Sequence, residues 1–322
     1  MNNERSGFTE DVVNLFRGLC MGCADIVPGV SGGTVALILG HYRRLVAAIS
    51  HIDRDLLKLI SQRKIKEAVS YADIRFLVAV AFGMAAGIIA LASLMNYLLE
   101  NQLGYTLAVF TGLILASSII VFRRLERWRW QLLVFVLLGG VFAWQICVQR
   151  PAHVDLTPMS AFLCATVAIC AMILPGISGA FVLLLLGVYH PVTELIKGIP
   201  KGEFTSGGLL IVAAFLAGCL VGLLTFSRIL KWLLEKYHDR TLAVLIGLML
   251  GSLYKIWPFQ IATPESSELP FKEKTFEHVA IGATPDSVAI VAICALAAFA
   301  GTFALERIGH SISGDDTEQT QG

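Results

Sequence analysis

The sequence predicts an all-α polytopic membrane protein made of two inverted repeats, each a broken, re-entrant helical hairpin followed by three transmembrane helices. Three observations predict this fold class. The 322 residues are 56% hydrophobic and 15% charged, whereas soluble domains carry about 25% charged residues. A Pro-Gly-x-Ser-Gly motif occurs twice, at Pro28 and at Pro175. The 25 Lys and Arg residues also divide unequally between the two sides of the membrane that this topology defines.

The first predicted hairpin covers residues 12–49. Its apolar halves, 12–27 and 34–49, are each shorter than the ~20 residues that a helix needs to cross the hydrocarbon core. Between them, Pro28 and three glycines free backbone groups that lipid cannot satisfy. We therefore expect protein or a water-filled cavity to surround this break.

The remainder of repeat 1, which covers residues 11–150, is a polar loop and three spans. The loop, 43–75, contains eight basic residues. The apolar runs that follow it are uninterrupted, and each is long enough to cross a membrane. The predicted spans are 76–99, 105–122 and 130–148.

Repeat 2 covers residues 158–308 and has the same order of elements. Its hairpin, 160–196, is broken at Pro175-Gly-Ile-Ser-Gly179. The predicted spans are 209–234, 241–258 and 288–305. The two repeats form one membrane domain within 1–322, and the polar segment 309–322 is predicted to be a disordered tail.

The repeat extends beyond the two breaks. Gly83-x-x-x-Gly87 recurs as Gly218-x-x-x-Gly222, and Thr-Leu-Ala-Val occurs at both 106–109 and 241–244. Small residues at this spacing let neighbouring helices approach closely, so the matches indicate a duplicated packing unit without requiring a binding role.

Parity and charge together predict that the second repeat is inserted upside down relative to the first. A broken segment either turns back or crosses the membrane twice, so it contributes an even number of crossings. With the three spans that follow, each repeat crosses the membrane an odd number of times. Nineteen of the 25 Lys and Arg residues then fall on the side of the N-terminus and of the 43–75 loop. Basic loops stay in the cytoplasm, so we expect both termini there. The net charge of +1 gives no argument for binding nucleic acid.

The paired breaks predict a site for an anion, most naturally a phosphate. Broken helices in inverted repeats place substrate sites near the middle of the membrane, and a helix N-terminus presents free N–H groups and the positive end of its dipole. The alternative is that both motifs only turn the chain back. The predicted phosphate-binding residues are Gly29, Ser31, Gly32, Gly33, Thr34, Gly176, Ser178 and Gly179, with Pro28 and Pro175 as helix breakers.

Asp25 is the acidic residue within the first broken segment, and Met172 takes its place in the second. An ionisable group at this depth indicates a function, either as a proton carrier or as a ligand for a coupling cation such as sodium. Alternatively, its carboxylate accepts hydrogen bonds from loop N–H groups and holds the fold. Arg17 is either a counter-charge for the substrate or for Asp25, or an anchor at the membrane interface.

Other polar and sulfur-containing residues give weaker signals. His41, His190 and Glu194 lie beside the broken segments, and the sequence does not decide whether they contact the substrate. Cys20 and Cys23 form a C-x-x-C pair, but no second pair or neighbouring His completes a metal site. The seven cysteines are interpreted as small apolar residues, and neither a metal nor a cofactor is predicted.

The first motif, Gly-x-x-Ala-Asp25-Ile-Val-Pro-Gly-Val-Ser-Gly-Gly-Thr34, together with Pro175-Gly-Ile-Ser-Gly179, resembles the bacterial polyprenyl-phosphate transporters of the PopT type. The resemblance extends from about residue 16 to residue 307. It implies a flippase in the bacterial cytoplasmic (inner) membrane that returns undecaprenyl phosphate from the outer to the cytoplasmic leaflet. The lipid carrier of cell-envelope and peptidoglycan synthesis would thereby be recycled. The implied partners are the polyprenyl phosphate lipid and the bilayer; the coupling ion and a homo-oligomeric state are left open.

Two other functions use similar physics. A secondary transporter for small soluble anions would bind its substrate at the same helix ends. A polyprenyl-pyrophosphate phosphatase also has a Pro-Gly-x-Ser loop, but by resemblance it requires an arginine directly after the serine, where this chain has Gly32 and Gly179. Phosphate hydrolysis without a cationic clamp or a metal is hard to support, so we expect a protein that is not an enzyme.

Overall fold

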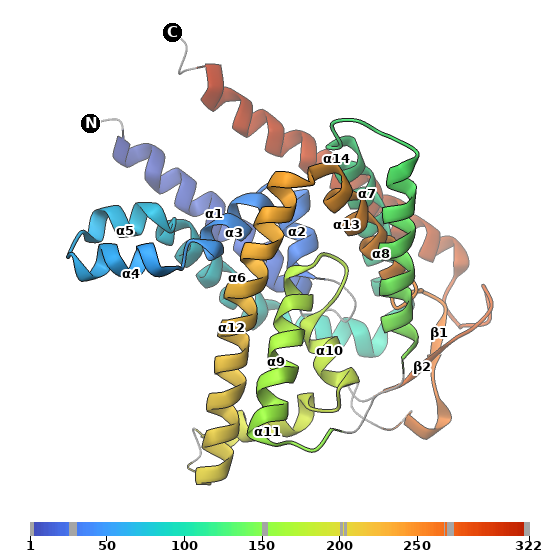
Figure 1. The fold of residues 1–322 in the computed structure, drawn as a ribbon. Coiled ribbons are helices and arrows are strands. Elements are labelled where there is room, and N and C mark those ends of the chain that lie inside the picture. Colours follow the sequence, from blue (N-terminus) through green and yellow to red (C-terminus); the bar gives the residue numbers. More distant parts are fainter. Residues whose placement is uncertain are drawn as a thin grey trace.

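The computed structural model describes residues 3–25, 31–149, 154–199, 202, 205–266, 268 and 274–318. Within these residues the chain forms fourteen α-helices and one small two-stranded sheet, and the fold is that of an all-α polytopic membrane protein (Figure 1). In this described part, four helices are long and apolar enough to cross a membrane. They are α6 (Ile74–Asn101), α7 (Leu103–Arg123), α8 (Gln131–Val148) and α12 (Ser206–Lys236).

The first broken segment consists of three helices rather than two. Helix α1 (Asn3–Asp25) precedes the break, and α2 (Gly32–Ile38) and α3 (Tyr42–Ser50) follow it. The predicted half 34–49 is therefore divided, because Gly40 adopts a φ of +78°. A glycine in the left-handed region ends a helix at low steric cost.

The second broken segment has the same three parts. Helix α9 (Pro158–Ile173) precedes the break, and α10 (Gly179–Leu185) and α11 (Tyr189–Gly198) follow it. Gly187 has a φ of +72°, and the axes of α10 and α11 differ by 110°. The sequence contained a signal for both turns, since Gly-x-Tyr occurs at 40–42 and again at 187–189.

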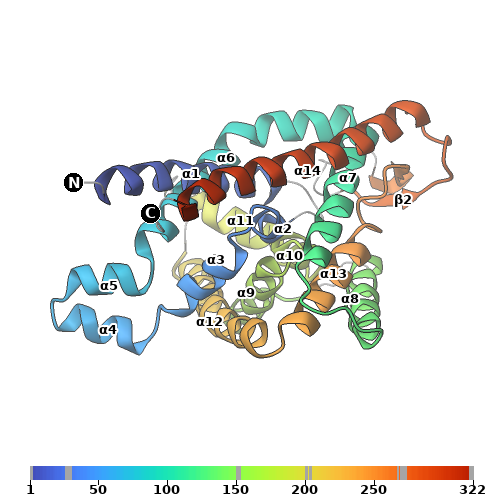
Figure 2. The same cartoon turned by 90° about the horizontal axis from the view of Figure 1, so that it is seen from above.

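The polar loop 43–75 forms a helical hairpin that repeat 2 lacks. Helices α4 (Arg54–Ser61) and α5 (Ile65–Tyr71) extend sideways from the bundle in both views (Figures 1 and 2). Leu56, Ala68 and Ala72 form a small core between them. The hairpin is thus a separately packed element attached between α3 and α6.

Asp53 connects the two helices of this hairpin, and we expect Asp53→Ala to destabilise it by about 1 kcal/mol, as for loss of an N-cap. Its Oδ1 accepts hydrogen bonds from the N–H groups of Asp55 and Leu56, each at 3.0 Å, and its Oδ2 accepts one from the Tyr71 hydroxyl at 2.9 Å. Hydrogen exchange of the α4 amides measures the effect. Asp55→Ala, in the same turn, is the control and should leave that exchange nearly unchanged.

The same carboxyl gives the hairpin a pH dependence. Burial acts to raise the pKa of Asp53, but hydrogen bonds from Leu56, Tyr71 and Asp55 together hold that pKa below its usual value. A lowered pKa contributes stability above the ordinary Asp pKa of about 4 and loses it as the pH falls further. Relative to the intrinsic exchange rate at each pH, exchange in α4 should therefore accelerate below about pH 4 in the wild type more than in Asp53→Asn. Equal acceleration in both proteins would contradict this assignment.

Helix pairs in the two halves pack through equivalent glycines. A Cβ placed on Gly83 of α6 would lie 2.1 Å from the backbone oxygen of Leu15 in α1, and one on Gly218 of α12 would lie 2.2 Å from that of Phe162 in α9. Leu15 and Phe162 are 147 positions apart, as are Pro28 and Pro175. The α1–α6 and α9–α12 pairs therefore use the same register.

The third span of each half packs against the other half. Helix α13 (His238–Ser252) contacts α8, where a Cβ on Gly247 would lie 2.1 Å from the Val136 oxygen. Helix α14 (Val288–Glu318) contacts α7, where a Cβ on Gly112 would lie 2.0 Å from the Ala295 oxygen. Gly112 and Gly247 are matching positions of the two repeats. The packing is therefore reciprocal: the third span of each half packs on the second span of the other.

Two boundaries differ from the sequence prediction. The helical part of 241–258 ends at Ser252, and turns with N–H groups bonded three residues back follow it. Strands β1 (Gln260–Ala262) and β2 (Phe276–His278), which were not predicted, then pair antiparallel. Helix α14 continues to Glu318, into the segment expected to be a disordered tail, because no proline after Pro285 stops it.

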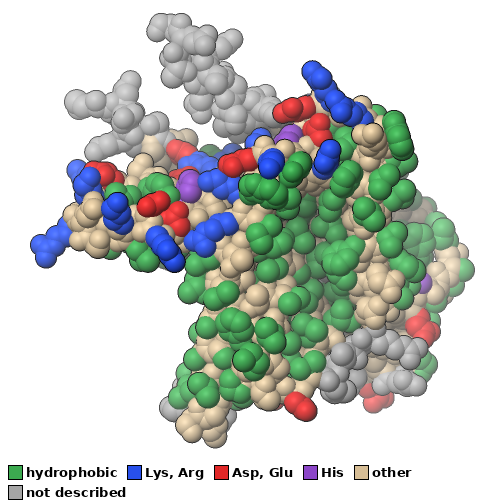
Figure 3. Space-filling model, in the orientation of Figure 1, with side chains coloured by type: hydrophobic (Ala, Val, Ile, Leu, Met, Phe, Trp, Pro, Cys, Tyr) green, Lys and Arg blue, Asp and Glu red, His purple; other side chains and the backbone are tan. Residues whose placement is uncertain are grey.

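Charge and apolar surface separate along the bundle. In Figure 3, Lys and Arg side chains gather at the upper end and over the α4–α5 hairpin, whereas hydrophobic side chains dominate the surface below. Large apolar side chains are exposed on the long helices, among them Phe82 and Ile89 on α6 and Leu216 on α12. Such a surface is expected for contact with lipid.

Candidate functional site

The two breaks of the chain lie against each other. The Ser31 hydroxyl donates a hydrogen bond to the backbone oxygen of Met172 at 3.1 Å, and the Gly176 N–H donates one to Thr34 Oγ1 at 3.0 Å. Ser31, Thr34 and Gly176 are all buried. The hydroxyls of the first motif therefore bind the backbone of the second, 141 and 142 positions away.

Close backbone approach accompanies these bonds. A Cβ on Gly33 would lie 2.8 Å from the Ile173 oxygen, and one on Gly176, where φ is +89°, would lie 2.9 Å from the Leu248 oxygen. The Ile173 oxygen also accepts a 3.0 Å hydrogen bond from the hydroxyl of Tyr42, which is buried at the start of α3. A side chain at position 33 would push the two breaks apart, and one at position 176 would push the second break away from α13, so glycine is required at both.

Asp25 occupies the N-terminus of α2. The Gly32 N–H donates to Asp25 Oδ1 at 2.6 Å, and the Gly33 N–H donates to Ser31 Oγ at 3.1 Å. Asp25 Oδ2 is buried, and no hydrogen-bond donor is found for it among the described residues. The carboxylate of Asp25 thus lies at the helix N-terminus where the sequence predicted the phosphate. It accepts a backbone hydrogen bond there, as in the structural alternative given for this residue.

The second break is arranged differently from the first. Ser178 is buried at the N-terminus of α10, but within the described residues its side chain makes no capping hydrogen bond to that helix. A Cβ on Gly179 would lie 2.8 Å from the Ala168 oxygen. Pro175 follows Leu174, the C-terminal cap of α9. Among the residues that the structure describes, a side-chain carboxylate therefore occupies the helix N-terminus at the first break and not at the second.

Thr34→Val should destabilise the contact between the breaks by about 1–3 kcal/mol, since it leaves the buried N–H of Gly176 without a partner. The residue volume hardly changes, so the effect isolates the hydroxyl. Thermal unfolding in detergent measures it, and Thr34→Ser, which keeps the hydroxyl, is the control. Equal unfolding temperatures for wild type and Thr34→Val would show that the hydrogen bond contributes nothing.

The remaining predicted residues are spread around this centre. Pro28 and Gly29 lie outside the described residues. Arg17 donates a 3.0 Å hydrogen bond to Asn14 Oδ1 on its own helix, and it precedes Asp25 by eight residues, or about 12 Å along α1. The structure therefore does not pair Arg17 with Asp25.

His41 is buried, and its side chain contacts Met21 of α1 and not the described motif residues. Its Nε2 lies 3.2 Å from the Met21 sulfur, and Nδ1 has no hydrogen-bond partner in the described part of the chain. His190 packs its ring edge-on against Tyr189. Tyr42 is the residue that sequence reasoning missed, although its recurrence as Gly-x-Tyr after both breaks was a usable signal.

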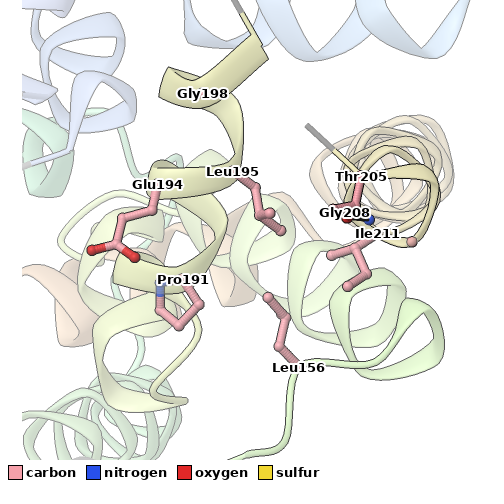
Figure 4. Close-up of a pocket in the computed structure, with 9 residues that line it drawn as sticks. Leu156, Pro191, Glu194, Leu195, Gly198, Thr205, Gly208 and Ile211 are labelled. Atoms are coloured by element: carbon pink, nitrogen blue, oxygen red, sulfur yellow. Dashed lines mark hydrogen bonds between the residues drawn. The ribbon is translucent and has the colours of Figure 1, made fainter. Parts of the chain in front are cut away.

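A hollow lies between α11 and the start of α12, away from the motif residues. Its volume is about 580 Å³, and none of its lining residues belongs to either break. Leu195 and Leu156 point into this space, whereas the Glu194 carboxylate points to the opposite side of α11 (Figure 4). Glu194 is thus a surface group of α11, separate from the contact between the breaks. No cluster of three or more metal-binding side chains occurs in the described segments.

Comparison with known proteins assigns the chain to a family. The family model described as undecaprenyl phosphate translocase-like matches residues 21–269, which include both breaks. The chain belongs to this family. A relative named polyprenyl-phosphate transporter from Vibrio cholerae serotype O1 is 38% identical over 299 residues, which cover 90% of this chain and 94% of the relative.

A second relative with the same name comes from Staphylococcus aureus. It is 31% identical over 258 residues, covering 76% of this chain and 86% of the relative. No solved structure matches the chain. The resemblance inferred from the two motifs is therefore confirmed at the level of the family.

Proposed function

We propose that this protein carries polyprenyl phosphate across the bacterial cytoplasmic membrane, from the outer to the cytoplasmic leaflet, so that the lipid carrier is used again. The observation that carries the proposal is the direct contact of the two breaks, Ser31 with Met172 and Gly176 with Thr34, in a member of this family. Both relatives described above are named polyprenyl-phosphate transporters. Transport requires no bond to be broken, so the proposal describes a non-enzyme.

In this proposal the phosphate binds between the two breaks, at the N-terminus of α2 and at the backbone of the second break. Helix N–H groups replace the water of the headgroup, while the polyprenyl chain remains in lipid. The Gly32 N–H is already bonded to Asp25. Two anions at one donor repel each other, so Asp25 takes up a proton or turns away when phosphate arrives. Asp25 Oδ2, which has no hydrogen-bond partner among the described residues, gives that proton, or a coupling cation, a place to bind.

The two halves act as inverted repeats that rock about this site, with both termini in the cytoplasm. The equivalent glycine contacts of Gly83 and Gly218, and the reciprocal packing of the third spans, support a duplicated unit. Single cysteines at Gln102 and Glu268 test the topology. Both should react with a membrane-impermeant thiol reagent added to intact cells, and labelling only after the membrane is opened would reverse the assignment.

The deciding experiment is transport by the purified protein in liposomes that contain labelled undecaprenyl phosphate in one leaflet. Faster exchange between leaflets than in empty liposomes is the expected result. Parallel liposomes loaded with inorganic phosphate or chloride test the small-anion carrier, and movement of these ions without movement of the lipid would overturn the proposal. Release of inorganic phosphate from undecaprenyl pyrophosphate would instead identify a phosphatase.

A further inference from the structure

An apolar groove connects the basic end of the bundle with the second break. It is enclosed by α12, α13, α8 and the residue that follows α9, with a volume of about 270 Å³. Leu174, directly before Pro175, lines one part, and Arg240 lines another. The lining residues on α12 run from Phe226 to Leu233, about 10 Å along the helix, and Tyr237, which follows the end of α12, extends the lining.

The lining is apolar over most of this length. Its α12 face consists of Phe226, Leu230 and Leu233 at helical spacing, and its α13 face includes Val244 and Leu245. The hydroxyl of Thr241, which also lines the groove, already donates to the backbone oxygens of Leu233 and Tyr237, at 3.1 and 2.9 Å. The groove therefore offers an occupant hydrocarbon contacts and few hydrogen bonds.

Arg240 supplies a positive charge to this apolar surface. Its guanidinium lies 5.8 Å from the ring centre of Phe135 and 5.5 Å from that of Tyr237, so two aromatic rings hold it beside the groove. In the part of the chain that the structure describes, the side chain of Arg240 forms no ion pair. An anionic headgroup can bind there without displacing a carboxylate.

The matching position in repeat 1 has no such charge. Tyr105 stands 135 positions before Arg240, and its hydroxyl accepts a 3.1 Å hydrogen bond from the Ser287 N–H. A Cβ on the neighbouring Gly104 would lie 2.3 Å from a carboxylate oxygen of Asp286. The equivalent surface thus presents a carboxylate, and an anion would be retained only at the Arg240 end.

We infer that this groove binds the first isoprene units of the transported polyprenyl phosphate, with the phosphate on Arg240. This assignment rests on the proposed function. An isoprenoid phosphate suits the site because its chain is hydrocarbon from the first carbon after the phosphate. A glycerophospholipid carries ester groups next to its phosphate, and their oxygens would be desolvated against Leu233 and Val244 without partners. In this assignment the lipid occupies the groove after its headgroup has left the breaks. Leu174 links the two places, since it lines the groove and directly precedes Pro175 of the second break.

The test uses the full-length protein in liposomes and a polyprenyl phosphate that carries a photoreactive diazirine in its first isoprene units. Crosslinks should map to Phe135, Phe226 or Val244. Val244→Trp fills the groove and should lower both crosslinking and transport about tenfold, since the chain no longer fits. Val221→Trp, on the exposed face of α12, is the matched control and should retain both.

The charge is tested separately. Arg240→Gln should weaken binding of the probe about fivefold, the effect of one basic residue on an anionic lipid headgroup. Arg129→Gln, at an exposed basic residue outside the groove, should leave binding unchanged. Displacement of the probe by phosphatidylglycerol as readily as by unlabelled polyprenyl phosphate would overturn the assignment, because the groove would then bind lipids generally.

The outcomes separate the two proposals. If the wild type transports the lipid phosphate while Val244→Trp transports at the wild-type rate, the groove assignment fails and the proposed function stands. If the wild type crosslinks in the groove but moves no lipid phosphate, the groove is a binding site and the transport proposal fails. Crosslinks confined to residues outside the groove would also reject the assignment.

Discussion

Asp25→Asn is expected to slow transport of the lipid phosphate by about 10- to 100-fold, which corresponds to the roughly 1.5–3 kcal/mol of an interaction with a charged group. The amide oxygen of Asn can still accept the N–H of Gly32, so the fold should persist. What the variant loses is a negative charge that can be neutralised when the substrate binds. Liposome exchange of labelled undecaprenyl phosphate measures the rate, and thermal unfolding confirms that the protein is folded.

The pH dependence of the same assay distinguishes a transport role from a structural one. If Asp25 exchanges a proton during transport, the wild-type rate changes with pH and the Asp25→Asn rate does not. Glu194→Gln removes a carboxylate that points away from the hollow between α11 and α12 and should preserve both rate and pH profile. A wild-type rate in Asp25→Asn would assign Asp25 to the fold alone.

Gly218→Val is expected to lower the unfolding temperature by about 10 °C, since overpacking costs about 3 kcal/mol. The side chain would meet the backbone of α9 at Phe162, where a Cβ already lies 2.2 Å from the oxygen. Backbone cannot move aside as a flexible side chain can, so α9 and α12 must separate.

Gly207→Val is the matched control on the same helix. A Cβ there meets nothing within 4 Å, so the same substitution should change the unfolding temperature little. Thermal unfolding of both variants in one detergent makes the comparison. Similar losses in the two proteins would mean that helix propensity, and not close packing, sets the effect.

The sequence predicted local breaks well because their causes are local. Pro28, Pro175 and the glycines beside them interrupt hydrogen bonding wherever they stand, and the six apolar runs were long enough to identify as helices. Their duplication also predicted that the breaks meet, which agrees with the hydrogen bond between Ser31 and Met172. The Gly40 and Gly187 turns were not predicted, although Gly-x-Tyr follows both breaks, because a glycine in an apolar run does not by itself reveal a positive φ.

Contacts between segments distant in the sequence were harder to predict. Gly112 and Gly247 recur as matching small residues in the sequence, but small residues do not show which helix packs against them. The position of the Asp25 carboxylate on Gly32 was one of two alternatives, and only coordinates show which donor it binds. The groove beside Arg240 could not be recognised from the sequence, since its residues come from four separate segments of the chain.

The reciprocal packing of α8 on α13 and of α14 on α7 has a consequence for biogenesis. Each half leaves a glycine-lined helix face to be covered by the other, so the first half is not complete when its own last residue has been synthesised. Gly112 of α7 remains uncovered until α14 has been inserted. A ribosome-bound chain that ends before α14 should therefore expose that face to lipid and become a substrate for membrane proteases, whereas the finished chain does not.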